Sequence, residues 1–284
     1  MKTDLKTEEM TIGNRRFSFG AHTYVMGILN VTPDSFSDGG RYDKIDQALF
    51  HAQEMTEAGA DILDIGGEST RPGHIQVSDQ EEIERVVPVI EAVKQRFDVP
   101  VSLDTYKAAV ARAGIAAGAD LLNDIWGLHY EKEPEGAMGR LTAESGTVCC
   151  LMHNRTNPLP GLTPERLMEE MLADAKRALD LGIPADKIIL DPGIGFAKTQ
   201  EENLMVMAHL KQLQEMGYPL LLGASRKSCI DYVLHLPADQ RLEGTLATTA
   251  YAVEARLAFV RVHDVKEHVR FIRMMEAIRE RRDG

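Results

Sequence analysis

Short, almost continuously apolar runs alternate with segments of helical hydrophobic spacing from about residue 23 to the end of the chain. The eight runs read YVMGILN, DILDIGG, VPVSLD, ADLLND, TVCCLMH, KIILDPG, PLLLGAS and AFVRVHD. Short runs that are rich in Val, Ile and Leu are typical of parallel strands buried on both faces. Eight strands, each followed by a helix at roughly 30 residues per unit, predict an α/β fold of the (β/α)8 TIM-barrel type.

Two of the intervening segments show the helical pattern most clearly. Their predicted buried faces are Ile83, Val86, Val87, Ile90 and Val93 in one helix and Leu167, Met168, Met171, Leu172 and Leu179 in the other. Pro88 lies inside the first helix and predicts a kink. Thr163 and Pro164 suit the N-cap and the first turn of the second.

Every apolar run ends in a polar residue, and these are Asn30, Asp64, Asp104, Asn123, His153, Asp191, Ser225 and His263. A polar residue at one such end can simply mark where a buried strand reaches solvent. In a closed barrel, however, all these ends meet on the rim where barrel enzymes keep their active sites. The alternative fold, a doubly wound open sheet, would need edge strands with more polar alternation.

Composition narrows the class of protein. The chain has 284 residues, with 32 Lys and Arg against 44 Asp and Glu and a formal net charge of −12. We expect a single domain over residues 1–284, in which residues 1–22 are an N-terminal extension. The acidic balance argues against nucleic-acid and membrane binding. Three cysteines form no disulfide or zinc pattern, and the absence of a signal-like or membrane-spanning run predicts a cytoplasmic protein.

The strand ends carry a set of motifs that together resemble one family. The motifs are NVTPDSFSDGG, GGESTRPG, SLDT, NDI, LMHNR, DPGIGF, SRKS and RVHDV. In order and spacing, over nearly the whole chain, they resemble dihydropteroate synthases. The resemblance implies a transferase of folate biosynthesis that joins hydroxymethyl-dihydropterin pyrophosphate to p-aminobenzoate, releases pyrophosphate and uses Mg²⁺. It also implies a sulfonamide target and a homodimer formed through late helices, with Leu246, Tyr251, Ile272 and Met275 as candidate contacts.

The resemblance also assigns candidate roles to individual residues. The substrate-binding set is Phe36, Thr70, Arg71, Pro72, Asp104, Asn123, Met152, Asp191, Phe196, Lys227, Ser228, Arg261 and His263. The catalytic set is Asp104, Lys227, Arg261 and His263. Two polar loops, residues 31–42 and 66–78, are expected to close over p-aminobenzoate beside Lys227 and Ser228. Cys229 stands where the family often has an aromatic residue, and we expect only a packing change there.

The chemistry of the pterin-binding residues fits these roles. A pterin presents adjacent N–H donors that a buried carboxylate such as Asp191 can accept in parallel. The alternative for Asp191 is a structural ion pair with Lys227, because a buried carboxylate needs a partner. For Asp104 the competing role is an N-cap, and for Asn123 a loop cap.

Arg261 and His263 stand two residues apart on the last strand, so their side chains point the same way. An arginine suits both a flat ring and a phosphate, and we expect His263 to face Asn30 across the barrel. Asn30 is the metal candidate, because Mg²⁺ is held by few protein oxygens and completes its coordination with water and phosphates.

No activated nucleophile is evident in the sequence. None is needed if the pterin ring stabilises a carbocation-like methylene as pyrophosphate leaves. We expect this dissociative mechanism, in which Asp104 supports the positive charge and the two loops exclude water. Two alternatives remain. One is a pterin-binding domain that transfers a methyl group to a corrinoid, and the other is a catalytically silent paralogue that binds pterin pyrophosphate.

Overall fold

Eight parallel strands form a ring in the structure, a computed structural model that describes residues 7–32, 41–69, 75–156 and 161–283. The strands are β3 (Tyr24–Asn30), β4 (Ile62–Gly66), β5 (Val101–Asp104), β6 (Leu121–Asp124), β7 (Val148–Met152), β8 (Ile188–Asp191), β9 (Leu221–Leu222) and β10 (Phe259–Val262). Hydrogen-bonded neighbours follow the order β8-β7-β6-β5-β4-β3-β10-β9, and a bridge between Leu190 and Leu220 joins β8 to β9. The predicted barrel and all eight predicted strands are confirmed, and the open sheet is excluded.

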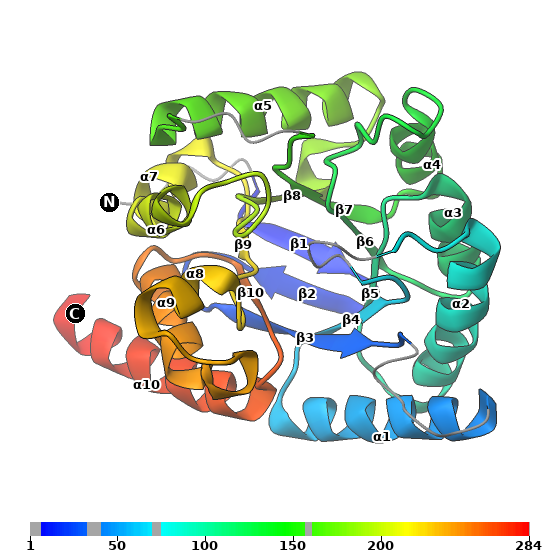
Figure 1. Ribbon diagram of the computed structural model, residues 1–284, viewed down its shortest axis with the longest axis horizontal. Coiled ribbons are helices and arrows are strands. Elements are labelled where there is room, and N and C mark those ends of the chain that lie inside the picture. Colours follow the sequence, from blue (N-terminus) through cyan, green and yellow to red (C-terminus); the bar gives the residue numbers. More distant parts are fainter. Residues whose placement is uncertain (1–6, 33–40, 70–74, 157–160, 284) are drawn as a thin grey trace.

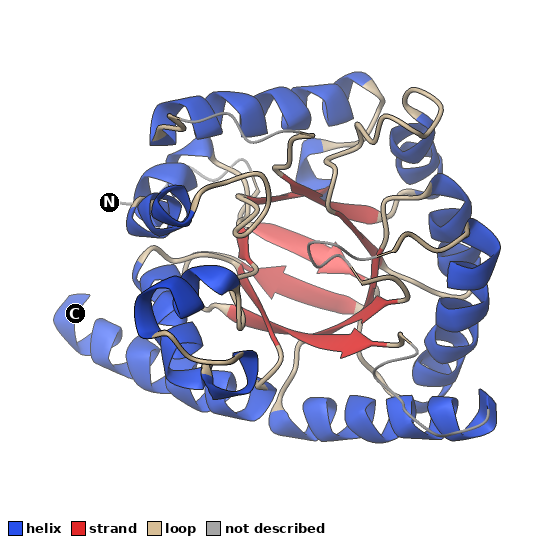
Figure 2. Cartoon of the chain, in the orientation of Figure 1, coloured by secondary structure: helices blue, strands red, loops and turns tan. Residues whose placement is uncertain are grey.

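Helices surround this ring on its outer side (Figure 2). They are α1 (Arg41–Ala58), α2 (Asp79–Arg96), α3 (Ala108–Ala116), α4 (Ala137–Ser145), α5 (Pro164–Asp180), α6 (Gln200–Ala208), α7 (Leu210–Leu213), α8 (Ser228–Leu234), α9 (Leu242–Glu254) and α10 (Val265–Asp283). Short 3-10 turns, η2 (Ala185–Lys187), η3 (Gln214–Met216) and η4 (Ala238–Gln240), lie between them. Among the described helices, none is long and apolar enough to cross a membrane.

The two helices predicted in detail are present, with one error. α2 runs through Pro88 as one helix and buries Val86, Ile90 and Val93. α5 begins as expected, with the Thr163 side chain accepting a hydrogen bond from the Arg166 backbone N–H and Pro164 in the first turn. The prediction that Leu172 and Leu179 are buried is wrong, since Leu172 is 37% exposed and Leu179 is 42% exposed. Asp174, Ala175 and Ala178 occupy the barrel-facing positions in the same part of α5.

The N-terminal extension is part of the barrel, which the hydrophobic pattern did not reveal. β1 (Glu9–Ile12) and β2 (Arg15–Ser18) form an antiparallel hairpin that Figure 1 shows within the ring of strands. Its apolar side chains Met10, Ile12 and Phe17 are at most 3% exposed. They form one core cluster with barrel-interior residues such as Met26 and Phe259. The hairpin therefore fills the end of the barrel opposite the strand termini that carry the polar residues.

Candidate active site

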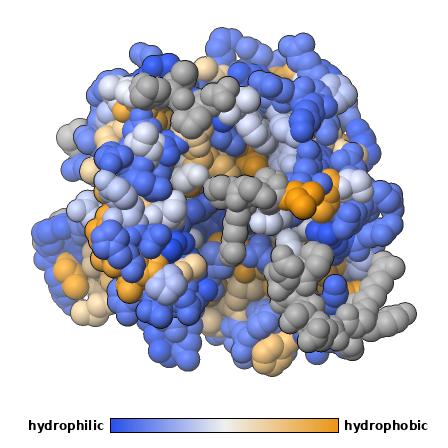
Figure 3. Space-filling model, viewed as in Figure 1, coloured by the Kyte–Doolittle hydropathy of each residue, from blue (hydrophilic) through white to orange (hydrophobic). Residues whose placement is uncertain are grey.

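A cavity of about 1130 Å³ opens at the carboxyl ends of the strands. Seven of the predicted site residues line it, namely Asn30, Asp104, Phe196, Lys227, Ser228, Arg261 and His263. Asn123, Met152 and Asp191 lie beneath this surface and are at most 5% exposed. In the space-filling view of this face, both hydrophilic and hydrophobic residues lie around the centre (Figure 3).

The register of the sheet arranges the polar strand ends in a row. Asn30 is opposite Gly66, Gly66 is opposite Asp104, and Asp104 is opposite Asn123. Gly66 leaves space inside this row: a Cβ added there would lie 3.7 Å from Asp104 Oδ2 and 3.8 Å from Asn30 Oδ1. Carboxylate and amide groups from β3, β5 and β6 therefore share one rim of the cavity.

Arg261 is held between two buried carboxylates. Its Nε donates to Asp64 Oδ2 and its Nη2 to Asp104 Oδ2, each at 2.6 Å. Ser102 donates to the other Asp64 oxygen at 2.5 Å. Burial raises the pKa of Asp104. The positive charge of Arg261 lowers this pKa, and the negative charge of Asp64 raises it. Asp104 Oδ1 is buried and has no hydrogen-bond partner among the described residues, so this corner of the cavity offers an acceptor to a donor on a ligand.

Asp191 ends β8 as a buried carboxylate. Its Oδ1 accepts the Gly193 backbone N–H at 2.7 Å, and its Oδ2 lies 3.5 Å from the position of a Cβ added at Gly223, a residue of the cavity lining. Burial raises the pKa of Asp191 to about 6, against the Gly193 hydrogen bond and the charge of Lys227. Among the described residues no ion pair joins Asp191 to Lys227, so the structural alternative for this carboxylate is not realised.

His263 and Arg261 both line the cavity, as predicted from their spacing. His263 Nδ1 and Ser225 Oγ are 2.8 Å apart, and the His263 backbone N–H donates to the same hydroxyl at 3.2 Å. The expectation that His263 faces Asn30 across the barrel is wrong. β10 pairs directly with β3, so the two residues belong to neighbouring strands.

Aromatic and cationic groups also line the cavity. The Lys227 ammonium lies 4.3 Å from the centre of the Phe196 ring, and burial lowers the pKa of Lys227 to about 8. Met152 belongs to a small cluster with Tyr106 and Ile125, against which Phe196 packs. Cys229 is fully buried in the main core, in agreement with a packing role.

Four predicted site residues, Phe36, Thr70, Arg71 and Pro72, lie outside the described residues. Both ends of the segment that contains the last three are described. Lys107 Nζ donates to Glu68 Oε2 at 2.7 Å, to the Val77 carbonyl at 2.7 Å and to Glu82 Oε2 at 2.8 Å. The Val77 backbone N–H also donates to Glu68, so a buried ammonium clamps the base of this segment beside the cavity.

Sequence reasoning missed the roles of Asp64 and Lys107. Asp64 lies at the end of an apolar run, the same pattern that identifies the other strand-end residues as candidates. Nothing local indicated that it meets Arg261, which lies 197 residues away. Lys107 gave no signal, because its two carboxylate partners lie 39 and 25 residues away.

The comparisons with known proteins agree with this geometry. The family described as pterin binding enzyme matches residues 26–263. The chain is 52% identical over 274 residues to the dihydropteroate synthase of Clostridium beijerinckii, with 95% of this chain and 99% of the relative covered. The chain belongs to the dihydropteroate synthase family.

Solved structures give the same result. The dihydropteroate synthase of Clostridium difficile, determined in the presence of pteroic acid, superposes with a TM-score of 0.87 at 45% identity over 92% of this chain and 98% of that chain. The enzyme of Xanthomonas albilineans with 4-aminobenzoic acid gives a TM-score of 0.89 at 36% identity over 96% and 99%.

Proposed function

We propose that the chain condenses hydroxymethyl-dihydropterin pyrophosphate with p-aminobenzoate to give dihydropteroate and pyrophosphate. The observation that carries this proposal is a pair of strand-end carboxylates, Asp104 in the cavity lining and Asp191 beneath it. Asp104 Oδ1 has no hydrogen-bond partner among the described residues, and the Gly193 N–H engages only Oδ1 of Asp191. A pterin ring carries N–H donors on adjacent positions, which such carboxylates accept in short, charge-assisted hydrogen bonds. Asn123, whose amide lies 3.5 Å from Asp64 Oδ2, completes the polar floor.

The chemistry needs no nucleophilic side chain. The bond between the methylene carbon and the pyrophosphate oxygen breaks while the pterin ring shares the positive charge. The amine nitrogen then forms the carbon–nitrogen bond and releases one proton. Asp64 and Asp104 share the single guanidinium of Arg261. The three groups together can carry one net negative charge, which favours a cationic methylene at this end of the cavity.

The departing pyrophosphate requires positive charge on the same rim. Lys227, Arg261 and His263 supply donors there, and Ser225 orients the His263 ring. Mg²⁺, when bound, neutralises part of the pyrophosphate charge. The described residues contain no cluster of three or more His, Cys, Asp or Glu suited to a metal ion. We propose that the ion would be held by the amide oxygen of Asn30, which lines the cavity, and by the substrate's own phosphates.

We further propose that a sulfonamide occupies the p-aminobenzoate position beside Lys227 and Ser228, and that the protein acts as a cytoplasmic homodimer. The exposed Tyr251 on α9 and the half-buried Leu246 and Met275 remain candidate dimer contacts. Ile272 does not, because it is 1% exposed and belongs to the core.

Release of pyrophosphate, measured with both substrates, tests the function. We expect release that depends on Mg²⁺ and on p-aminobenzoate, with dihydropteroate formed in equal amount. Methyl transfer from a methylated pterin to a corrinoid, without pyrophosphate release, would show instead that the barrel serves the related methyltransfer chemistry. Tight binding of the pterin pyrophosphate without turnover would indicate a catalytically silent paralogue.

A further inference from the structure

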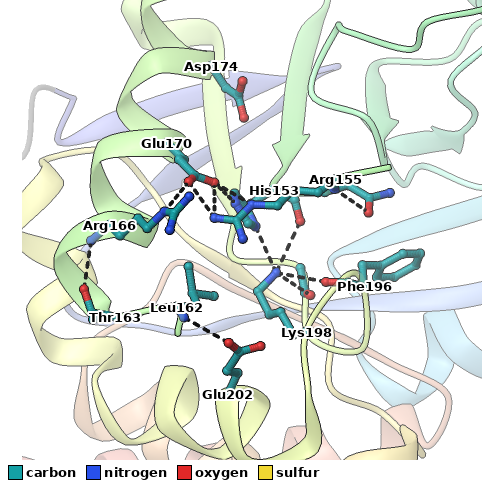
Figure 4. A network of polar contacts seen from close by, with 12 residues as sticks. His153, Arg155, Leu162, Thr163, Arg166, Glu170, Asp174, Phe196, Lys198 and Glu202 are labelled. Atoms are coloured by element: carbon teal, nitrogen blue, oxygen red, sulfur yellow. Dashed lines mark hydrogen bonds and ion pairs between the residues drawn. The ribbon is translucent and has the colours of Figure 1, made fainter. Parts of the chain in front are cut away.

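The Lys198 ammonium joins the segments that follow two neighbouring strands, β7 and β8 (Figure 4). Its Nζ donates to His153 Nδ1 at 2.9 Å, to the Gly193 carbonyl at 3.0 Å and to the Phe196 carbonyl at 3.2 Å. An ammonium has three N–H donors, so these acceptors satisfy it completely. His153 follows β7, whereas Gly193 and Phe196 belong to the loop after β8.

His153 is prepared as an acceptor for this lysine. Its Nε2 lies 2.8 Å from Glu170 Oε2, and a carboxylate there requires the ring proton on Nε2, which leaves Nδ1 to accept. Burial and the charge of Lys198 lower the pKa of His153 to about 4, so the ring is neutral at pH 7. Glu170 is itself fixed by Arg155, at 2.5 Å, and by Arg166, at 3.1 Å.

The loop that Lys198 holds runs through several left-handed backbone positions. Gly193, Gly195 and Ala197 have φ values of +70°, +82° and +46°, in the left-handed region. A Cβ at Gly193 would lie 2.1 Å from the His153 carbonyl oxygen. Glycine adopts positive φ values without strain, whereas Ala197 carries a Cβ and keeps its left-handed conformation only when surrounding contacts hold it. Lys198 supplies two of those contacts, and Asn203 Oδ1 supplies another by accepting the Gly195 N–H at 2.7 Å.

Two pterin-facing groups depend on this loop. The Gly193 N–H directs the Asp191 carboxylate through its 2.7 Å hydrogen bond. The Phe196 ring lines the cavity beneath the Lys227 ammonium. Lys198 itself is placed by the start of α6, where Thr199 and Glu202 form a reciprocal capping box. The Lys198 side chain thus connects the capped start of α6 to the loop that positions the Asp191 carboxylate and the Phe196 ring.

We propose that Lys198 is a positioning residue for pterin recognition, which sets the direction of the Asp191 carboxylate and the place of the Phe196 ring by fixing the loop between them. This inference rests on the proposed function. Lys198 contacts the lining residue Phe196 but does not itself line the cavity, so its effect falls on binding of the pterin and not on the chemical step.

The first test is Lys198→Met, which keeps the length of the side chain and removes all three donors. Lys176→Met is the matched control, because Lys176 is an exposed lysine on α5 whose side chain is 72% accessible. Binding is followed by the fluorescence of Trp126, the one tryptophan of the chain, which lines the cavity. The ligands are a pterin that lacks phosphates and, separately, inorganic pyrophosphate with Mg²⁺.

For Lys198→Met we expect pterin affinity to fall at least about tenfold, the effect of losing hydrogen bonds to a charged group. Pyrophosphate affinity should stay within about twofold, since its contacts lie on other strands. KM for the pterin pyrophosphate should rise while kcat at saturation changes little. Pterin affinity within about twofold of the Lys176→Met control would overturn the proposal.

A second pair of variants separates positioning from a general loss of stability. His153→Asn keeps an acceptor oxygen near the place of Nδ1 and loses the donor to Glu170, whereas His153→Gln does the reverse. We expect His153→Gln to weaken pterin binding as Lys198→Met does, and His153→Asn to retain it. Equal effects of the two variants would show that the contact with Lys198 is not what matters. If the unmodified protein does not bind the pterin, the proposed function itself fails.

Discussion

Replacement of Asp191 by asparagine isolates the contribution of one carboxylate to pterin binding. In the folded protein the asparagine Oδ1 can still accept the Gly193 N–H, which Asp191 Oδ1 accepts at 2.7 Å. Its NH2 group then stands where Asp191 Oδ2 lies and meets the pterin N–H groups donor against donor. Loss of a hydrogen bond to a charged group costs about 1.5–3 kcal/mol. This corresponds to roughly 10- to 150-fold weaker pterin binding at about 1.4 kcal/mol per tenfold.

The assay is a titration with a phosphate-free pterin, read by Trp126 fluorescence and repeated by calorimetry. Inorganic pyrophosphate with Mg²⁺ serves as the control ligand, and its affinity should be unchanged. If the variant binds the pterin within about twofold of the unmodified protein, Asp191 does not contact the ring and the carboxylate argument is refuted.

The same variant makes a prediction about stability. Burial raises the pKa of Asp191 from 3.8 to about 6. A carboxyl whose pKa is higher in the folded than in the unfolded state makes the free energy of unfolding fall as the pH rises from about 4 to about 6, because the folded state holds the proton more tightly. This loss of stability persists at higher pH. Two pKa units correspond to at most roughly 3 kcal/mol. Asp191→Asn should therefore have a higher Tm than the unmodified protein near pH 7.5 and a similar Tm near pH 4. A lower Tm near pH 7.5 would contradict this account.

Three further predictions concern other parts of the molecule. Lys107→Met should destabilise the fold by about 3–5 kcal/mol in urea titrations, because it leaves two buried carboxylates uncompensated; a loss below about 1 kcal/mol would mean that these groups are protonated or hydrated. Arg261→Ala should weaken binding of both pyrophosphate and the pterin in calorimetry, whereas His263→Ala should affect pyrophosphate alone. Unchanged pyrophosphate binding in both variants would place the phosphate elsewhere on the rim. Phe17→Ala should cost about 3–5 kcal/mol of unfolding free energy, and a negligible cost would show that the hairpin is dispensable.

The barrel could be predicted from the sequence because strands that are buried on both faces consist of short apolar runs, which are visible in the local sequence. The strand-end residues could be predicted for a related reason: all parallel strands of a closed barrel end on one rim. Asp104, Asn123 and Asp191 were found in this way, and the register confirms that the first two are neighbours.

The features that escaped prediction depend on distant partners. Lys107 and Lys198 look like ordinary helix-end lysines until the fold brings carboxylates, carbonyls or a histidine ring to them. The N-terminal hairpin pairs only four residues per strand. Its apolar side chains become buried only when they pack against the barrel interior, which the local sequence does not show. Leu172 and Leu179 show a different error, because helical spacing does not tell which edge of an apolar stripe faces the barrel. Ile272 is a candidate dimer contact from the family resemblance, and the structure buries it in the core instead.

The closure of the ring has a consequence for how the chain is made. β3 pairs with β4 on one side and with β10 on the other, and Tyr24 meets Phe259 across a separation of 235 residues. During synthesis, the second edge of β3 stays without its strand until residue 262 has emerged. An unpaired edge of this kind is a site for intermolecular strand pairing. Nascent chains interrupted before β10 should therefore aggregate or recruit chaperones, whereas interruption late in α10 leaves the ring already sealed.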